Sequence, residues 1–357
     1  MLTRPDRAVP RGIRAELLAW PKWGIWGLAR FAGSVSTLTK KRALISGISG
    51  QDGSLLAKLL LEKGYEVIGT SRDAEMSSFG NLRKLGIFDR VQRRSMTMND
   101  FRSVLQVLTE VKPDEIYNLA GQSSVGLSFM QPVETLESIA HATLNLLEAV
   151  RFLNVPTKLY NAASSECFGE STIDNPANEM TPFRPRSPYG VAKATAFWEV
   201  ANYREAYGLF ACSGILFNHE SPFRPARFVT RKVVQTASRI AAGSKERMHI
   251  GAIHVKRDWG WAAEYVDAMW RMLQQDQPDD FVIATGETHS LEDFIAITFS
   301  HVGLNWRDHT DVDSTLFRAT DISESHGNPA HALAKLDWRA ETRLPALVAK
   351  LIAAETA

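Results

Sequence analysis

Tyr189 and Lys193 have the types and spacing of a proton-transfer pair. They are four positions apart in a segment with helical periodicity, so both side chains should lie on one helix face. A neighbouring ammonium favours the phenolate and would lower the pKa of Tyr189, which could then take a hydroxyl proton as hydride leaves the same carbon. Ser164, at the end of an expected strand, could share that hydroxyl. The spacing alone also arises by chance, so the elements around it must support the interpretation.

A glycine-rich turn indicates where a cofactor could bind. The apolar run Arg42–Ser46 is followed by Gly47, Gly50 and Gly53, and then by apolar residues at helical spacing. Glycines allow a sharp turn, close approach of a ligand and tight packing of helix on strand. The first amides of a helix lack intrahelical acceptors, so a dinucleotide pyrophosphate would satisfy them. An ordinary glycine-rich turn is the alternative interpretation.

The end of the next expected strand, residues 65–71, bears on the choice of cofactor. In a Rossmann unit this position meets the adenosine ribose and distinguishes a free hydroxyl from a 2′-phosphate. Arg72 would form a charge-assisted pair with a phosphate, whereas Asp73 could accept from a hydroxyl. The arginine favours NADP. The alternative is that Arg72 and Asp73 are solvated charges without a ligand.

The wider pattern alternates strands and helices. Such alternation predicts parallel strands with right-handed crossovers, the doubly wound α/β fold of Rossmann proteins. After about Ser221 the rhythm changes, which predicts a smaller α/β substrate domain at residues 223–357, after a dinucleotide-binding domain at 41–222 that includes part of 253–285. The expected strands are Arg42–Ser46, 65–71, 115–119, 158–162, 210–217 and 281–285, and the expected helices are 53–63, 101–110, 132–153 and 190–206.

The composition excludes several classes of protein. The 357 residues are 45% hydrophobic and 23% charged, as in soluble globular proteins, and a formal net charge of +1 gives no general attraction to nucleic acid or anionic membranes. The two cysteines, Cys167 and Cys212, form neither a disulfide framework nor a zinc pattern. We therefore expect a cytoplasmic protein without a metal.

Residues 1–40 differ from the rest of the chain. They combine scattered arginines with Trp20, Trp23 and Trp26 but are interrupted by Pro21 and Lys22, so they fit neither a transmembrane span nor a secretory signal. Residues 15–32 could contact a membrane as an interfacial helix. A poorly ordered extension is the favoured interpretation.

The motifs resemble those of the extended short-chain dehydrogenase/reductases and, among them, the GDP-mannose 4,6-dehydratase family. The resemblance covers about residues 42–350, and its pieces occur in family order. They are Gly47-Ile-Ser-Gly-Gln-Asp-Gly53, Tyr117-Asn-Leu-Ala-Gly-Gln-Ser123, Ser164-Ser-Glu166, Arg186-Ser-Pro-Tyr-Gly-Val-Ala-Lys193, Gly214-Ile-Leu-Phe-Asn-His-Glu-Ser-Pro222, Arg227-Phe-Val-Thr-Arg-Lys232, Lys256-Arg-Asp-Trp-Gly260 and Ile283-Ala-Thr-Gly-Glu287.

The resemblance implies a role for Glu166. Oxidising a sugar hydroxyl to a ketone makes the neighbouring C–H acidic, and a carboxylate could remove that proton. In the family this carboxylate drives loss of water across C5 and C6 of GDP-mannose, after which the hydride held by NADP returns to C6. The implied catalytic set is Ser164, Glu166, Tyr189 and Lys193. The alternative for Glu166 is a surface or salt-bridged glutamate.

The resemblance also implies binding residues and a homo-oligomer, either dimer or tetramer. Residues 223–357 would bind the GDP-sugar. Cofactor contacts are expected from Gly47, Gly50, Gln51, Asp52, Gly53, Arg72, Thr97, Met98, Leu119, Ala120, Gly121, Gln122, Ser123, Tyr189, Lys193, His219 and Arg224, and substrate contacts from Ser124, Asn218, Lys232, Arg257, Glu287 and Arg318.

Some positions depart from the family pattern. Asp73 stands where a second arginine is usual, and Thr97 stands where an aspartate is expected near the adenine. The loop after Asp73 is also altered, which puts a tetramer in doubt. Two alternatives stay open. An NADP-dependent reductase or epimerase of a related GDP-sugar would have no task for Glu166, and a catalytically silent protein of this fold would have lost at least one of the four catalytic residues.

Overall fold

A parallel sheet of seven strands organises most of the chain, in the order β10-β6-β5-β4-β1-β2-β3. The computed structural model describes residues 40–318 and 320–356, so the predicted N-terminal extension and its membrane contact lie outside the described residues. The strands of this sheet are β1 (Arg42–Ser46), β2 (Glu66–Ser71), β3 (Gln92–Ser95), β4 (Glu115–Asn118), β5 (Lys158–Ser164), β6 (Ala211–Leu216) and β10 (Phe281–Ile283).

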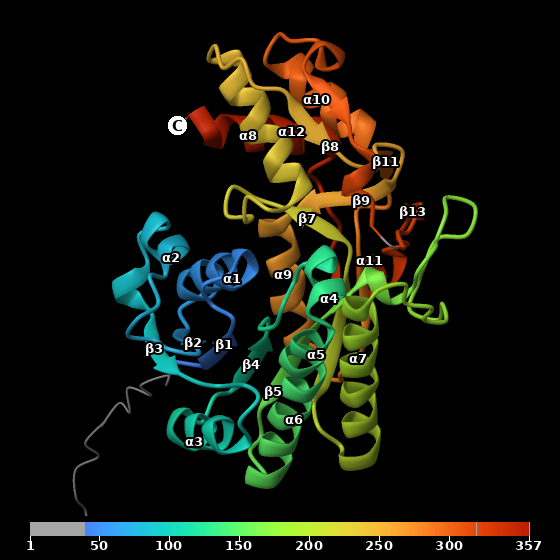
Figure 1. Ribbon diagram of the computed structural model, residues 1–357. Coiled ribbons are helices and arrows are strands. Elements are labelled where there is room, and N and C mark those ends of the chain that lie inside the picture. Colours follow the sequence, from blue (N-terminus) through green and yellow to red (C-terminus); the bar gives the residue numbers. More distant parts are fainter. Residues whose placement is uncertain (1–39, 319, 357) are drawn as a thin grey trace, which may run out of the picture. The chain divides into compact units, whose positions relative to one another are not determined.

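Helices cover both faces of this sheet (Figure 1). Apolar residues such as Leu56 and Met269 pack α1 and α9 on one face, whereas Val104 and Leu146 pack α3 and α6 on the other. The strand order reverses at β1, which lies between β2 and β4, and ligands bind at such a switch point in open α/β sheets. The predicted doubly wound parallel fold is confirmed. The helices are α1 (Gln51–Glu62), α2 (Gly80–Lys84), α3 (Phe101–Val111), α4 (Val125–Met130), α5 (Pro132–Leu136), α6 (Ala142–Leu153), α7 (Pro188–Tyr207), α8 (Val229–Ala241), α9 (Ala262–Leu273), α10 (Leu291–His301), α11 (Ala330–Leu336) and α12 (Leu344–Thr356).

A second hydrophobic core lies in the later part of the chain. Val233 of α8, Phe294 of α10 and Leu347 of α12 pack with Trp259. Two small sheets frame this core, β11-β9-β13 with β7 paired to β9, and β8 paired to β12. Their strands are β7 (Asn218–Glu220), β8 (Met248–Ile250), β9 (Lys256–Trp261), β11 (Thr288–Ser290), β12 (Thr310–Val312) and β13 (Glu324–Ser325).

The long helix expected at 132–153 is divided by a wider turn of π type at Glu137–His141. Such turns are frequent at functional sites because they displace the backbone locally. Here the turn faces the loop after β4: the backbone N–H of Gln122 donates to Oγ of Ser138 at 3.2 Å, and a Cβ on Gly121 would lie 2.9 Å from the Ile139 side chain. The turn therefore fixes a loop at the carboxyl edge of the sheet. Within the described part of the chain, no helix is long and apolar enough to cross a membrane.

Candidate active site

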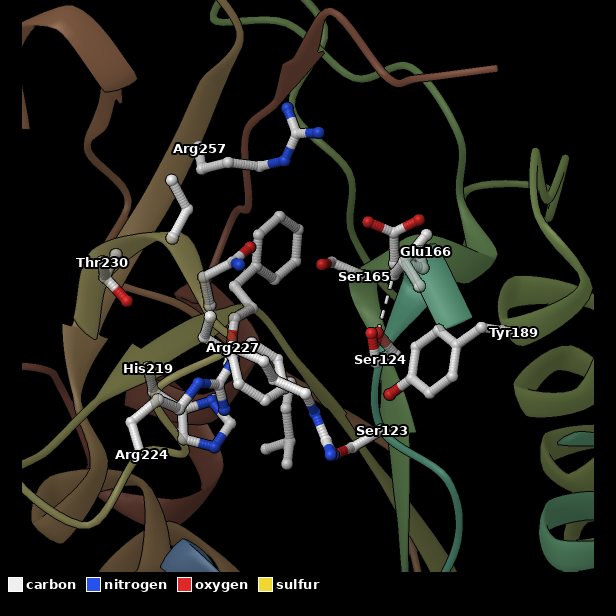
Figure 2. A pocket seen from close by; sticks show the side chains of 18 of the residues that line it. Ser123, Ser124, Ser165, Glu166, Tyr189, His219, Arg224, Arg227, Thr230 and Arg257 are labelled. Carbon is white, nitrogen blue, oxygen red and sulfur yellow. Dashed lines mark hydrogen bonds between the residues drawn. The ribbon is translucent and has the colours of Figure 1, made fainter. Parts of the chain in front are cut away.

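A cavity of about 390 Å³ lies where the carboxyl ends of β4, β5 and β6 meet the segments of the second core. Figure 2 shows that side chains from both parts of the fold point into it. Sixteen of the residues predicted from sequence line this cavity: Asp52, Leu119, Ala120, Gly121, Gln122, Ser123, Ser124, Ser164, Glu166, Tyr189, Lys193, Asn218, His219, Arg224, Arg257 and Arg318.

The glycine turn forms a cradle beside the cavity. Gly47 has φ +77°, and its carbonyl accepts from Gly50 N–H at 3.0 Å. A Cβ on Gly53 would lie 2.4 Å from the Gly47 oxygen, and one on Gly47 would lie 2.8 Å from the Leu119 oxygen, so larger residues would collide with backbone. The N-cap of α1 is Gly50, which has no side chain to cap the helix amides. The turn thus leaves helix amides open to an anionic ligand.

An ion pair links α1 to β7 at the edge of the cavity. The Nε2–H of His219 donates to Oδ2 of Asp52 at 2.9 Å, and its Nδ1–H donates to the Phe217 carbonyl at 2.7 Å. Because both ring nitrogens face acceptors, this geometry suits an imidazolium. Burial alone would lower the pKa of His219, but the charge of Asp52 outweighs burial, so the pKa of His219 is raised. Burial alone would raise the pKa of Asp52, but His219 outweighs it, so the pKa of Asp52 is lowered. Both shifts therefore favour the charged forms of the pair.

Ser164, Tyr189 and Lys193 meet at the base of the cavity. Oγ of Ser187 accepts from Gly190 N–H at 3.0 Å and begins α7, which carries both Tyr189 and Lys193. Nζ of Lys193 donates to the Ala162 carbonyl of β5 at 2.6 Å, which anchors the helix to the strand that ends in Ser164. The sequence therefore places these three side chains together as expected.

The pKa of Tyr189 differs in direction from the sequence expectation. Burial raises it above its ordinary value, and the hydrogen bond from Ser164 opposes this only in part. Burial also lowers the pKa of Lys193 to about 8. Nζ lies 5.9 Å from the centre of the Tyr189 ring. Desolvation of both groups therefore dominates over the ammonium–phenol attraction that the spacing suggested.

Glu166 lies on the same wall as Ser164. It sits in a short 3₁₀ turn, Ser165–Cys167, that follows β5, and its backbone N–H donates to Oγ of Ser164 at 3.3 Å. Among the residues that the structure describes, no side chain or backbone group forms a hydrogen bond or ion pair with its carboxylate. Burial raises the pKa of Glu166, whereas the charges of Arg257 and Arg318 oppose the rise. The carboxylate is free to exchange a proton with a ligand in the cavity.

Arg257 faces Glu166 across the cavity from the second part of the fold (Figure 2), and Arg318 lines the same cavity. Arg257 is 7% exposed; its Nη2 donates to Oδ1 of Asp321 at 2.9 Å and its Nη1 donates to the Ile322 carbonyl at 2.8 Å. Nη1 of Arg318 donates to the same Asp321 oxygen at 3.2 Å. Two guanidinium groups that share one carboxylate retain donors for a further anion.

Other predicted residues lie outside the cavity lining. The Glu287 carboxylate is ion-paired with Arg343 at 3.3 Å, and Nζ of Lys232 donates to the His249 carbonyl at 2.6 Å. Their substrate contacts, and the cofactor contacts of the glycine turn and of the β2 and β3 ends, stay predictions. The residues concerned are Gly47, Gly50, Gln51, Gly53, Arg72, Thr97, Met98, Lys232 and Glu287.

Sequence reasoning missed five polar or charged residues that line the cavity: Ser165, Glu220, Arg227, Thr230 and Asp321. Asp321 lies three residues after the predicted Arg318, and its carboxylate chemistry was a signal for it. Arg227 is exposed, and within residues 40–318 and 320–356 it has no ion pair. Thr230 donates to Oε2 of Glu220 at 2.8 Å. Across the same ranges, no group of three His, Cys, Asp or Glu side chains could hold a metal ion.

Comparisons with known proteins agree with this arrangement. The family model described as GDP-mannose 4,6 dehydratase matches residues 44–351. GDP-mannose 4,6 dehydratase 1 of Arabidopsis thaliana is 45% identical over 325 residues, which cover 88% of this chain and 89% of that protein.

Solved structures share the fold at lower identity. DesIV, a dTDP-glucose 4,6-dehydratase from Streptomyces venezuelae with NAD bound, matches with a TM-score of 0.79 and 18% identity over 88% of this chain and 97% of that one. RMD from Pseudomonas aeruginosa complexed with NADPH matches with a TM-score of 0.73 and 20% identity over 88% of this chain and 98% of that one. The family model and the Arabidopsis relative together establish that this chain belongs to the GDP-mannose 4,6-dehydratase family.

Proposed function

We propose that this chain converts GDP-mannose to GDP-4-keto-6-deoxymannose and water by internal redox with NADP. The observation that carries the proposal is the unpaired carboxylate of Glu166 on the same cavity wall as Ser164 and Tyr189. A reductase or epimerase needs an alcohol–ketone site but no second base beside it. A dehydratase needs both within reach of one sugar.

The fold offers a fitting place for the dinucleotide. A Cβ on Gly47 or Gly53 would collide with backbone atoms, and one on Gly50 would lie 3.3 Å from the Gly47 oxygen. The amides at the start of α1 would receive the pyrophosphate. Leu119–Ser123 and Lys193 would hold the nicotinamide half, while Thr97 and Met98 would adjoin the adenine. The bound cofactor would supply the acceptor and later the donor of hydride.

We assign the preference for NADP to Arg72. Known neighbours of this fold carry either NAD or NADPH, so the choice must come from residues of this chain. Arg72 is exposed at the end of β2 and, in the described ranges, has no hydrogen bond or ion pair. Oδ1 of Asp73 instead accepts from the N–H groups of Glu75 and Met76 at 3.0 and 2.9 Å. The carboxylate is thus occupied by its own turn, and the guanidinium is free for a 2′-phosphate.

Tyr189 would act on the C4 hydroxyl of the sugar. Its phenol shares that hydroxyl with Ser164, and Lys193, held by the Ala162 carbonyl, contributes positive charge nearby. Because burial raises the pKa of Tyr189, the phenolate must be stabilised by charges that arrive with the ligands. Positive charge close to the phenol would lower the pKa of Tyr189. The hydrogen bond from Ser164 already lowers it in part.

Glu166 would then remove the C5 proton that the C4 ketone has made acidic. Its pKa, raised by burial, brings the carboxyl closer to the pH at which it can both accept and donate a proton. Loss of the C6 hydroxyl needs a proton from Glu166 or Tyr189, and return of a proton to C5 completes the cycle. Each of these transfers involves a group already on the cavity wall.

The GDP moiety would bind at residues 223–357, and the dinucleotide at 41–222 with part of 253–285. Arg257 and Arg318 suit the diphosphate because a guanidinium fork matches phosphate oxygens. Asp321 lines the cavity beside them, whereas Glu287, expected to accept from ribose hydroxyls, lies outside the lining. Ser124 and Asn218 line the sugar end, and Lys232 lies beside the β8 segment near the expected base.

The test is to incubate purified protein with GDP-mannose and NADP and to follow product mass and reduced cofactor. We expect a keto-sugar that has lost one water, formed over many turnovers without net NADPH. Accumulation of NADPH in stoichiometry with a keto-sugar that retains its water would favour a dehydrogenase. Unchanged mass with altered stereochemistry would favour an epimerase.

A further inference from the structure

Glu170 bridges two segments that face each other across the cavity. It lies in the same loop as Glu166, four residues later, and both of its carboxylate oxygens are engaged. Oε1 accepts from the backbone N–H of Ser323 at 2.7 Å, and Oε2 accepts from that of Glu324 at 3.0 Å. One side chain thus holds two consecutive amides of a segment about 150 residues away in sequence.

The segment held by Glu170 carries ligand-facing side chains. Residues 318–324 include Arg318 and Asp321, which both line the cavity. The arginine at β9, Arg257, binds the segment from the opposite side through the Asp321 carboxylate and the Ile322 carbonyl. Arg257 therefore fixes the segment to the second core, whereas Glu170 fixes it to the loop that carries Glu166.

Two neighbouring contacts reinforce the same link. The Thr320 hydroxyl donates to the Arg186 carbonyl at 2.5 Å, and Ser171 N–H donates to the Glu324 carbonyl at 3.1 Å. Arg186, the acceptor in the first contact, lies two residues before α7, the helix that carries Tyr189. The segment is thus tied to both loops that present the candidate catalytic side chains. Two carboxylates take part: Glu170 of the loop, and Glu324 of the segment, whose Oε1 accepts from Ile173 N–H at 3.1 Å.

We propose that Glu170 is a positioning residue that sets Arg318 and Asp321 at the distance from Glu166 required to bind the sugar diphosphate. This inference rests on the proposed function. A carboxylate bound to two amides forms charge-assisted hydrogen bonds, which are shorter and stronger than neutral ones. Without it, the segment would retain the Arg257 contacts and its other hydrogen bonds to the loop, but would lose the two charge-assisted bonds that hold Ser323 and Glu324 to the loop after Glu166. The defect would appear in nucleotide-sugar binding and not in cofactor binding.

The chain contains a matched control in the same loop. Oε1 of Glu179 accepts from the backbone N–H of Val282 at 2.7 Å, so it also joins a carboxylate to a distant amide. That amide belongs to β10 of the large sheet and not to residues 318–324. Loss of Glu179 would loosen the loop to a similar degree without releasing the ligand-facing segment.

The experiment compares wild-type protein with Glu170→Ala, Glu170→Gln and Glu179→Ala. The Kd for GDP and the Kd for NADP are measured by calorimetry, KM and kcat with GDP-mannose, and Tm by thermal unfolding. We expect Glu170→Ala to weaken GDP binding and raise KM by about ten-fold, the loss expected for such hydrogen bonds, with kcat and NADP affinity little changed. Glu170→Gln keeps one acceptor oxygen and should recover part of the loss. Glu179→Ala should lower Tm without changing the Kd for GDP.

The outcomes separate the two proposals. Unchanged GDP binding in Glu170→Ala, or an equal loss in Glu179→Ala, would overturn the positioning role while wild-type turnover of GDP-mannose still supports the proposed function. If Glu170→Ala binds GDP more weakly than wild type, and the wild-type protein does not dehydrate GDP-mannose, the positioning role is supported and the proposed reaction is refuted. Wild-type protein that binds no GDP would refute both.

Discussion

Replacing Glu166 by glutamine separates the two halves of the proposed reaction. The carboxamide has nearly the same size and cannot take a proton. Because the Glu166 carboxylate has no hydrogen bond or ion pair within the described ranges, the change breaks no contact that holds the fold. We therefore expect the free energy of unfolding to change by less than about 0.5 kcal/mol.

The magnitude follows from the role of a general base. Proton transfer by a positioned side chain contributes about 10²–10⁴-fold, equal to about 2.7–5.4 kcal/mol of transition-state free energy. Glu166→Gln should lose this factor in water elimination. Oxidation at C4 depends on Ser164, Tyr189 and Lys193, which the change leaves in place. Reduced cofactor should therefore accumulate to about one equivalent per site and then decay slowly.

Rapid mixing with GDP-mannose and detection of reduced nicotinamide absorbance would measure this burst, and mass analysis of the quenched sugar would measure loss of water. Glu179→Gln, which changes the same functional group in the same loop at a position outside the cavity lining, serves as a control that should show no burst. Multiple-turnover dehydration at the wild-type rate by Glu166→Gln would refute the assignment of the C5 base. A variant that forms no reduced cofactor would instead mean that Glu166 is needed for binding or oxidation.

Three further predictions concern the cofactor site. Arg72→Ala should raise KM for NADP by about ten-fold or more and leave KM for NAD nearly unchanged, because one charge-assisted contact is removed; equal effects on both cofactors, or the same effect from Arg90→Ala, would contradict the role of Arg72. Gly53→Ala places a Cβ 2.4 Å from the Gly47 oxygen and should cost about 1–3 kcal/mol of stability and weaken NADP binding, whereas Gly80→Ala, where the nearest atom is 3.9 Å away, should do neither. The Asp52–His219 pair should make stability depend on pH. Folding lowers the pKa of Asp52, so its contribution to stability is lost as pH falls through the folded pKa of Asp52. Folding raises the pKa of His219, so its contribution to stability is lost as pH rises through the folded pKa of His219. The contribution of this pair to the Tm of the protein without ligand should therefore be greatest between about pH 4 and 6.5. Asp52→Asn should flatten the plot of Tm against pH; parallel plots for wild type and variant would argue against a stabilising Asp52–His219 pair.

The catalytic elements could be predicted because their signals are local. The first strand and the glycine turn show an apolar run, turn residues and helical periodicity within twenty residues, and the structure has them as β1 and α1. The Tyr189 and Lys193 pair needed only the helical register of α7 to lie on one face. Glu166 was singled out by the family resemblance, since its two-residue spacing from Ser164 alone left a surface or salt-bridged glutamate equally possible.

Other features depend on packing between distant segments and gave no local signal. β3 has the sequence Gln-Arg-Arg-Ser, with no apolar residue, and forms because it pairs with β2 at the sheet edge while the Arg93 guanidinium stacks on Phe88. The position of Asp321 is set by Arg257, which lies far from it in sequence. The pKa of Tyr189 follows burial that no spacing rule contains.

The balance of charges around Glu166 favours this carboxyl over Tyr189 as the proton donor to the departing C6 hydroxyl. A group that takes a proton from C5 and later gives one to the departing oxygen works best when its pKa lies near the operating pH. Burial moves the pKa of Glu166 upward, while the charges of Arg257 and Arg318 oppose that rise. Burial moves the pKa of Tyr189 in the same direction from a much higher ordinary value, so its phenol is a weaker acid than the Glu166 carboxyl. One carboxyl alternating between base and acid would therefore perform the elimination, and the segment held by Glu170 carries one of the two arginines that tune it.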